Sequence, residues 1–281
     1  MSERRDLLIA TDLDGCLLDA TYSYEPARPA LAALARGFVP LVLASSKTRA
    51  EVEPLVRVLG LDTPFVVENG GALVVPRGLL PRGEQVVEED GPYAEIPLGT
   101  PRRVLVEALH DLAARTGVKV RGFAGLTAFD LERLTGLSAA AAVRALQRHY
   151  DEPFLVEGGD EPAERLASAA VRLGLVVSRG GQFHHLTGRV GKGDALRRLL
   201  EIYGVARRRF HTVALGDAAN DRSMLEISDR PIVVPRPNGS LEPSLAGALP
   251  RAERAPGPGP TGWNAAVLAV LRGERLPSVA A

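Results

Sequence analysis

Near its beginning the sequence reads Leu7-Leu8-Ile9-Ala10-Thr11-Asp12-Leu13-Asp14-Gly15. The apolar and β-branched residues predict a buried strand that ends at the two carboxylates, and Gly15 allows the backbone to turn there. In open parallel α/β sheets, ligands bind beyond the carboxyl ends of the strands, where Asp12 and Asp14 fall. Two carboxylates this close repel each other unless a cation or a shared proton separates them. The pattern therefore predicts a reaction centre; the alternative, two acids that only cap a helix, depends on the rest of the chain.

Strands and helices alternate on both sides of a central region. Helices are predicted at residues 29–36 and 48–59, the second from the capping box of Thr48 and Glu51, and strands at 38–44 and 64–67. After residue 188 the same pattern returns, with a helix from 191 to 204, strands at 212–215 and 232–234, a loop at 255–262 and a closing helix at 263–271. Such alternation predicts a parallel sheet with right-handed crossovers.

The central region has a different periodicity. Helices are predicted at 100–117, 138–150 and 162–173, and strands at 118–123, 154–157, 175–178 and 183–186. We therefore predict an α/β fold: a doubly wound parallel-sheet core formed by residues 1–82 and 188–281, with an inserted α+β cap domain formed by residues 83–187.

Composition excludes several classes of protein. The 281 residues are 46% hydrophobic, enough for a sizeable core, but contain no run long enough to span a membrane. The formal net charge of zero argues against a broad nucleic-acid surface, and the Arg207-Arg208-Arg209 run is interpreted as a solvated helix end. A charged start without a secretory segment and a single cysteine, Cys16, predict a cytoplasmic protein.

Four predicted strand ends and one helix start carry polar side chains. They are Asp12 and Asp14, then Ser45, Ser46 and Lys47, then Asn69, then Asp217 and Asp221, with Lys192 at the helix start. A doubly wound sheet brings such ends together at one edge. Carboxylates without thiolates or clustered imidazoles suit a hard cation such as Mg²⁺, whereas lysine, hydroxyls and helix-start N–H groups suit a phosphate. Together they predict metal-assisted phosphoryl transfer.

At this point the residues resemble a known family. Asp12-Leu13-Asp14-Gly15, Ser45, Lys192 and the stretch 216–221 (GDAAND) resemble, in order, the four motifs of the haloacid dehalogenase superfamily, and the insertion resembles the α/β cap of its sugar-phosphatase branch. Residues 41–48 (LVLASSKT), 64–72 (PFVVENGGA) and 181–188 (GQFHHLTG) are similar to the mannosyl-3-phosphoglycerate phosphatase family. The resemblance is weakest over the cap helices and after about Pro250. It implies hydrolysis of that substrate to mannosylglycerate and phosphate.

The resemblance also implies roles for the motif residues. Asp12 would attack phosphorus and form an aspartyl-phosphate, while Asp14 would protonate the departing oxygen and later accept a proton from water. Ser45 would hydrogen-bond a phosphate oxygen, and Lys192 would neutralise the nucleophile and the transferred group. Mg²⁺ would be held by Asp12, the main-chain carbonyl of Asp14 and Asp217, with Asp221 as an outer partner. Cys16 stands where the family usually has threonine, and a role as nucleophile is disfavoured because no histidine is near in sequence.

Residues outside the motifs are hypotheses for substrate binding. Arg148 and Arg179 offer forks for a glycerate carboxylate, although a surface role is the commoner one for arginine. Glu68 and Asn69 bind substrate hydroxyls or order their loop. His184 and His185 are adjacent on a strand and face opposite ways, so they cannot clasp one metal together. The predicted substrate-binding set is Ser46, Lys47, Glu68, Asn69, Gly70, Arg148, Arg179, Gln182 and His184.

Three alternatives stay open from the sequence. Two share the fold: a phosphatase of another sugar phosphate, and a hexose phosphomutase. The third belongs to another class, a receiver module in which phosphorylation of an aspartate switches partner binding. Asp14 and the size of the cap argue against the receiver. We expect a small phosphorylated sugar-glycerate as the partner, no nucleic acid or membrane, and a monomer or weak dimer.

Overall fold

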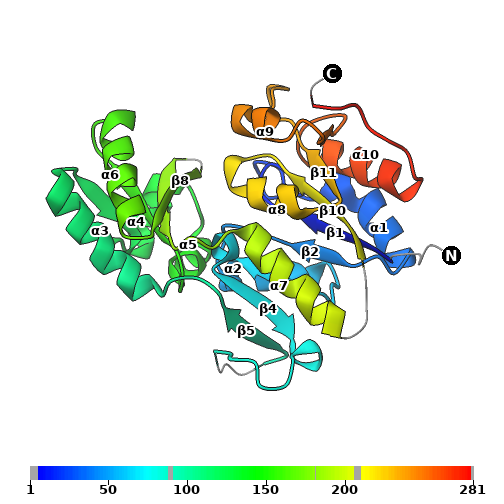
Figure 1. Cartoon of the computed structure of the whole chain (residues 1–281), viewed down its shortest axis with the longest axis horizontal. Coiled ribbons are helices and arrows are strands. Elements are labelled where there is room, and N and C mark those ends of the chain that lie inside the picture. Colours follow the sequence, from blue (N-terminus) through cyan, green and yellow to red (C-terminus); the bar gives the residue numbers. More distant parts are fainter. Residues whose placement is uncertain (1–5, 88–90, 181, 206–209, 280–281) are drawn as a thin grey trace.

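A computed structural model describes residues 6–87, 91–180, 182–205 and 210–279 of the chain. The Arg207-Arg208-Arg209 run and nearly all of the charged start of the chain lie outside the described residues. Figure 1 shows two parts: a larger one that contains both ends of the chain, and a smaller one, coloured green, built from the middle of the sequence. Among the described residues, none of the helices combines the length and the apolar character needed to cross a bilayer.

A five-stranded parallel sheet forms the centre of the larger part, in the order β12-β11-β10-β1-β2. Because β1 lies between β2 and β10, successive connections run in opposite directions from it, and the carboxyl ends of β1 and β10 meet at the switch point. The strands are β1 (Asp6–Thr11), β2 (Leu41–Leu43), β10 (Phe210–Gly216), β11 (Arg230–Val233) and β12 (Glu253–Arg254).

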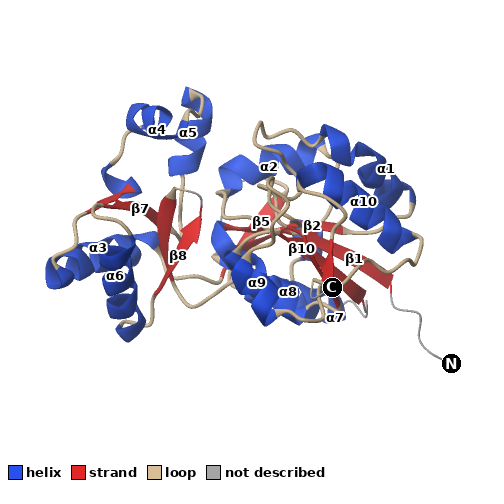
Figure 2. Ribbon diagram, turned by 90° about the horizontal axis from the view of Figure 1, so that it is seen from above, coloured by secondary structure: helices blue, strands red, loops and turns tan. Residues whose placement is uncertain are grey.

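Helices cover both faces of this sheet (Figure 2). Side chains alternate along each strand, so that Ile9 packs on one face and Leu8 on the other, and both faces are buried and apolar. One face is covered by α1 (Arg28–Arg36), α2 (Arg49–Val58) and α10 (Gly259–Leu271). The other is covered by α7 (Lys192–Val205), α8 (Arg222–Ile227) and α9 (Pro243–Ala248). These layers confirm the predicted doubly wound core.

The third predicted strand is joined to the parallel sheet by a single parallel bridge between Ala44 and Val66. This strand, β3 (Phe65–Val67), pairs antiparallel with β4 (Ala72–Pro76), and β4 pairs with β5 (Tyr93–Pro97). The hairpin and β5 are additions that the sequence patterns did not predict. The core–cap boundary at Arg82 stays a prediction. Because β5 still pairs with β4, we propose that the chain passes from the core to the cap nearer Gly99.

The smaller part contains an antiparallel sheet in the order β6-β7-β9-β8. Helices α3 and α6 pack on one face, around Leu105 and Phe154, and α4 and α5 lie toward the other, around Leu131 (Figure 2). The strands are β6 (Val120–Gly122), β7 (Glu152–Val156), β8 (Val176–Gly180) and β9 (Phe183–Thr187). The helices are α3 (Arg102–Thr116), α4 (Ala128–Thr135), α5 (Ala139–Leu146) and α6 (Asp160–Arg172). Short 3₁₀ turns lie at Glu25–Ala27, Glu68–Gly70, Arg77–Leu79, Phe123–Gly125 and Ala219–Asp221.

Two predicted elements differ in extent from the structure. The helix predicted to reach residue 150 ends at Leu146, because residues 147–151 turn back to contact the core. The closing helix begins at Gly259, inside the predicted loop, because Pro260 occupies a first-turn position where proline is tolerated. The capping box of Thr48 and Glu51 at the start of α2 is confirmed.

Candidate active site

The motif residues converge at the carboxyl ends of β1 and β10. Asp12 directly follows β1 and donates its backbone N–H to the carbonyl of Leu215, 3.0 Å away, and Asp217 directly follows β10. Lys192 begins α7 on the neighbouring connection. One carboxylate oxygen from each of Asp12, Asp217 and Asp221 lies within 4.8 Å of the others. Residues remote in sequence thus form one acidic cluster, as the switch-point geometry predicts.

Lys192 is completely buried between two of these acids. Its Nζ lies 2.5 Å from Asp12 Oδ1 and 2.7 Å from Asp221 Oδ1. Burial alone would lower the pKa of Lys192, but the charges of Asp12 and Asp221 outweigh that effect and raise the pKa above its ordinary value. The ammonium is therefore charged and held in a fixed position.

The acids carry more negative charge than Lys192 balances. Burial, and then the charge of Asp221, raise the pKa of Asp12 well above its ordinary value. The same two causes raise the pKa of Asp217 to about 7. Among the described residues, nothing donates a hydrogen bond to the buried Asp217 Oδ1. An added divalent cation would offset this repulsion, so the donor set fits a hard metal ion such as Mg²⁺.

Asp221 differs from the other two acids because both of its oxygens already accept hydrogen bonds. Oδ1 accepts from Lys192, and Oδ2 accepts from the backbone N–H groups of Asp217 and Ala218 at 3.0 Å each. Asp221 therefore orders the loop that carries Asp217. This arrangement suits an outer position relative to a bound cation better than a direct ligand.

Asp14 lies at the rim of the cluster. Its Oδ2 is 2.9 Å from Lys47 Nζ, and that ammonium lies 4.5 Å from the centre of the Tyr22 ring. Burial alone would lower the pKa of Lys47, but the charges of Asp14 and Glu51 and the hydrogen bond to Asp14 together outweigh it and raise the pKa. Gly15 turns the chain with φ +81°, and a Cβ there would lie 2.5 Å from Asp217 Oδ2. Glycine at this position therefore lets the two loops approach.

Ser45 and Asn69 hold neighbouring loops in place. Ser45 is buried, and its Oγ accepts the backbone N–H of Lys47 at 3.1 Å. Asn69 Oδ1 accepts a hydrogen bond of 2.9 Å from Asn220 Nδ2, which ties the loop after β3 to the loop after β10. The predicted phosphate and substrate contacts of Ser45 and Asn69 stay predictions.

Glu68 anchors the cap to the core. Its buried carboxylate accepts the backbone N–H of His149 at 2.9 Å and of Tyr150 at 2.7 Å. Burial raises the pKa of Glu68 to about 7, although the charge of Arg148 opposes the rise. The next residue but one, Gly70, has φ +96°, and a side chain there would collide with the backbone of Gly191. The contacts of Glu68 and the close approach of Gly70 to Gly191 therefore give both residues a structural role.

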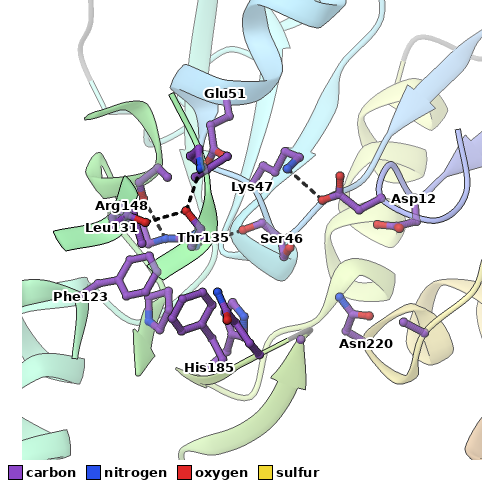
Figure 3. A pocket seen from close by; sticks show the side chains of 18 of the residues that line it. Asp12, Ser46, Lys47, Glu51, Phe123, Leu131, Thr135, Arg148, His185 and Asn220 are labelled. Atoms are coloured by element: carbon purple, nitrogen blue, oxygen red, sulfur yellow. Dashed lines mark hydrogen bonds and ion pairs between the residues drawn. The ribbon is translucent and has the colours of Figure 1, made fainter. Parts of the chain in front are cut away.

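A cavity of about 500 Å³ opens in front of the acids, between the core and the cap (Figure 3). Asp12, Lys47 and Asn220 lie on the core side, and Arg148 and His185 lie on the cap side. The predicted site residues that line it are Asp12, Asp14, Ser46, Lys47, Arg148, Gln182 and Asp217. Lining residues that were not among the predicted site residues include Tyr22, Glu51, Phe123, Phe183 and Asn220.

Two predicted substrate residues lie elsewhere. Arg179 is exposed and pairs with Asp160 at 3.0 Å. His184 packs its ring against Phe154, with centroids 5.6 Å apart, whereas His185 on the opposite face of β9 lines the cavity. The two rings thus lie on opposite faces of β9, as predicted. The ring that faces the cavity belongs to His185, whereas the hypothesis for substrate binding named His184. Burial, and then the charge of Arg179, lower the pKa of His184.

Cys16 is fully buried in the apolar layer beneath α1 and α10. Burial, followed by the charge of Asp217, raises the pKa of its thiol well above the ordinary value. A thiol in this state is a poor nucleophile. The structure thus supports a packing role for Cys16.

Comparison with known proteins gives a matching family, two relatives and one solved structure of similar fold. Residues 9–80 and 161–239 match the haloacid dehalogenase-like hydrolase family. The chain is 39% identical to the glucosyl-3-phosphoglycerate/mannosyl-3-phosphoglycerate phosphatase of Methanococcoides burtonii over 94% of this chain and 97% of that protein. It is 32% identical to the mannosyl-3-phosphoglycerate phosphatase of Pyrococcus horikoshii over 84% of this chain and 91% of that protein. A haloacid dehalogenase-like hydrolase from Bacteroides thetaiotaomicron, 18% identical, has a similar fold, with a TM-score of 0.64 and coverage of 95% and 99%.

Proposed function

Because this chain belongs to the haloacid dehalogenase-like hydrolase family, we propose that it is a Mg²⁺-dependent phosphatase that hydrolyses mannosyl-3-phosphoglycerate to mannosylglycerate and phosphate. The observation that carries the proposal is the cluster of Asp12, Asp217, Asp221 and Lys192, of which Asp12 and Asp217 line the cavity between the core and the cap. Relatives named for this activity support the choice of substrate. Glucosyl-3-phosphoglycerate is the second candidate, since one relative is named for both substrates.

The proposed reaction proceeds in two displacements at phosphorus. A carboxylate oxygen of Asp12 forms a bond to phosphorus while the bond to the glycerate oxygen breaks, and Asp14 gives a proton to that oxygen. Asp14 then removes a proton from water, whose oxygen displaces Asp12 and releases phosphate. Lys192 offsets the charge of Asp12, so that the carboxylate can approach an anionic phosphoryl group.

Mg²⁺ would be held by Asp12, the main-chain carbonyl of Asp14 and Asp217, with Asp221 as the outer partner. The unpartnered Asp217 Oδ1 and the two filled acceptors of Asp221 support this division. When bound, the cation withdraws negative charge from the phosphoryl oxygens and reduces the repulsion of the incoming carboxylate. A cytoplasmic location is also proposed, supported by Cys16 as the only cysteine of the sequence.

The test is phosphate release from a panel of phosphorylated compounds, with Mg²⁺ and with a chelator. We expect release from mannosyl-3-phosphoglycerate, glucosyl-3-phosphoglycerate or both, and much less from hexose phosphates and 3-phosphoglycerate. No release from either glycosyl substrate would overturn the substrate assignment. Labelled phosphate returned to a sugar would indicate a phosphomutase, and a long-lived phosphoprotein without turnover would indicate a receiver.

A further inference from the structure

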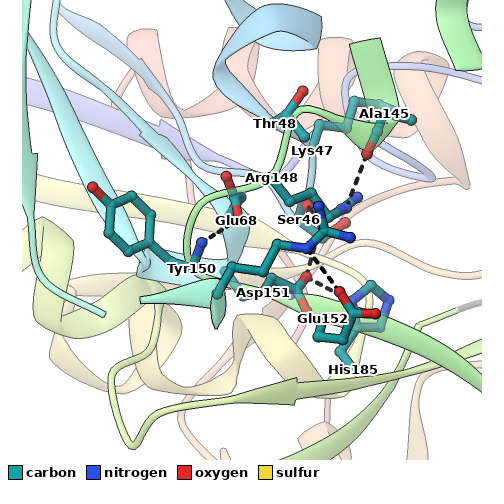
Figure 4. A network of polar contacts seen from close by, with 12 residues as sticks. Ser46, Lys47, Thr48, Glu68, Ala145, Arg148, Tyr150, Asp151, Glu152 and His185 are labelled. Carbon is teal, nitrogen blue, oxygen red and sulfur yellow. Dashed lines mark hydrogen bonds and ion pairs between the residues drawn. The ribbon is translucent and has the colours of Figure 1, made fainter. Parts of the chain in front are cut away.

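Asp151 is a fully buried acid between two residues that line the cavity (Figure 4). Its Oδ2 accepts from Arg148 Nη1 at 2.9 Å and lies 2.7 Å from His185 Nδ1. Burial alone would raise the pKa of Asp151, but His185 and Arg148 outweigh it and hold the pKa below its ordinary range. Because an ionised carboxylate only accepts hydrogen bonds, His185 Nδ1 carries the proton of this contact.

Both partners line the cavity, and these contacts leave one nitrogen of each without a hydrogen bond to the described residues. Arg148 uses Nε on the carbonyl of Ala145 and Nη1 on Ser46 and Asp151. Within the described part of the chain, no group accepts from Arg148 Nη2, and none hydrogen-bonds His185 Nε2. Gly180 lies beside this ring, since a Cβ there would be 2.9 Å from Nε2. Arg148 Nη2 is a donor, and Nε2 of a neutral His185 is an acceptor.

The surroundings favour a hydroxyl group over an anion at this corner. The charge of Arg148 is already offset by Asp151, so the group of three is neutral when His185 is neutral. Phe123 lies beneath the guanidinium at 5.7 Å and meets Phe183 edge to face, with centroids 4.9 Å apart. An apolar aromatic wall beside one donor and one acceptor suits a sugar ring, whose hydroxyls both accept and donate.

We propose that Asp151 is a positioning residue that fixes Arg148 Nη2 as donor and His185 Nε2 as acceptor for one hydroxyl of the substrate's sugar. The inference rests on the proposed function, because it assigns this corner to the sugar part of that substrate. Asp151 touches no substrate itself, and its effect passes through the two side chains that it orients. Under this proposal Arg148 contacts the sugar and not the glycerate carboxylate that it was expected to clamp.

The test compares the wild-type enzyme with Asp151→Asn on three substrates. They are the glycosyl-3-phosphoglycerate that the wild type hydrolyses, 3-phosphoglycerate, which lacks the sugar, and p-nitrophenyl phosphate. For the glycosyl substrate we expect KM to rise about tenfold or more, as for a lost hydrogen bond to a charged group, with kcat within about threefold. For the other two, kcat/KM should stay within about twofold of wild type.

Glu253→Gln is the matched control. Glu253 is also a buried acid paired with an arginine, Arg230, at 2.6 Å, but it lies in β12 at the edge of the parallel sheet and does not line the cavity. Its loss should therefore change all three substrates alike. An equal loss on every substrate in Asp151→Asn, or no loss at all, would overturn the inference. Inactivity of the wild type toward both glycosyl substrates would instead overturn the proposed function.

A second variant tests the same proposal if Asp151→Asn does not fold. Arg148→Lys keeps the charge partner of Asp151 but lacks the planar fork that reaches the cavity. We expect the same selective rise in KM for the glycosyl substrate, with kcat/KM for p-nitrophenyl phosphate near wild type. If Arg148→Lys leaves the KM of the glycosyl substrate unchanged, the assignment of Arg148, and with it that of Asp151, is wrong.

Discussion

Lys192 Nζ lies 2.5 Å from Asp12 Oδ1, although 180 residues separate the two in the sequence. The contact is buried and continues to Asp221 on the other side of the ammonium. Asp12 precedes the inserted segment and Lys192 follows it, and the two side chains still meet in the core. The ammonium is in place before a substrate binds. It therefore does not have to be reoriented during the reaction.

Asp12→Asn should abolish turnover, because an amide cannot form the bond to phosphorus that the proposed mechanism requires. We expect kcat for the glycosyl substrate to fall at least about a thousandfold. Phosphate release under saturating substrate measures the change, and thermal unfolding shows whether the variant is folded. Residual activity near the wild-type value would contradict the assignment of Asp12 as nucleophile.

Mg²⁺ should stabilise the folded protein through the acidic cluster. A cation that binds only the folded state adds about 2.7 kcal/mol to the free energy of unfolding at a hundred times its Kd. Thermal unfolding with Mg²⁺, compared with Na⁺ at equal ionic strength, measures the shift in Tm. Asp217→Asn removes the carboxylate with the unpartnered oxygen and should abolish most of the shift. An equal shift in both proteins would place the cation elsewhere.

Glu68 should make stability decrease as the pH rises. Its pKa is raised from 4.5 to about 7 in the folded protein, so between these values the unfolded chain releases a proton that the folded chain retains. The free energy of unfolding therefore falls across this window, by on the order of 3 kcal/mol, and the loss is complete above it. Urea unfolding at several pH values measures the slope.

Glu68→Gln should reduce the slope of the free energy of unfolding in this part of the pH profile, because its amide does not titrate, while Asp217, whose pKa is also raised to about 7, maintains part of it. Glu157→Gln, which changes an exposed glutamate (76% of the side chain accessible), is the matched control and should keep the wild-type slope. An unchanged slope in Glu68→Gln would show that another group causes the dependence.

Trp263→Phe should lower the free energy of unfolding by removing a hydrogen bond at the end of β1. The buried indole Nε1 donates to Thr11 Oγ1 at 2.8 Å, and Thr11 donates to the carbonyl of Asp12 at 2.8 Å. Phenylalanine keeps an aromatic ring but leaves Thr11 without its donor, at a cost of about 1–3 kcal/mol in the free energy of unfolding. Urea unfolding measures the loss. The double variant with Thr11→Val removes both partners, so the two losses should not add; simple additivity would contradict the contact.

The core and the acidic cluster could be predicted because short-range patterns specify them. Each strand of the parallel sheet is a short apolar run that ends in polar residues, and the topology then brings Asp12 and Asp217 together. Helix α4 was not predicted, although it has local signals: the capping box of Thr127 and Asp130 at its start and Gly136, in the left-handed conformation, at its end. The β4 and β5 pairing depends on contacts between segments separated by a loop, which no local pattern encodes.

The cap side of the cavity could be predicted only in part. Strand alternation showed that His184 and His185 face opposite ways, but not which face meets the core. That choice follows from Phe154 and Leu186, which pack under α3 and α6 and so turn His185 toward the cavity. Asp151 lies in no motif, because its role arises where a loop of the cap meets β9. Only the tertiary structure brings Asp151 between Arg148 and His185.

The two places where we propose that the chain crosses between core and cap contact each other: a Cβ on Gly188 would lie 2.5 Å from Thr100 Oγ1. A segment that leaves and re-enters a scaffold at adjacent points can be exchanged or lengthened without moving the ends to which it is attached. Selectivity for the departing alcohol can therefore change by replacement of one module, while the machinery that handles phosphorus is inherited intact.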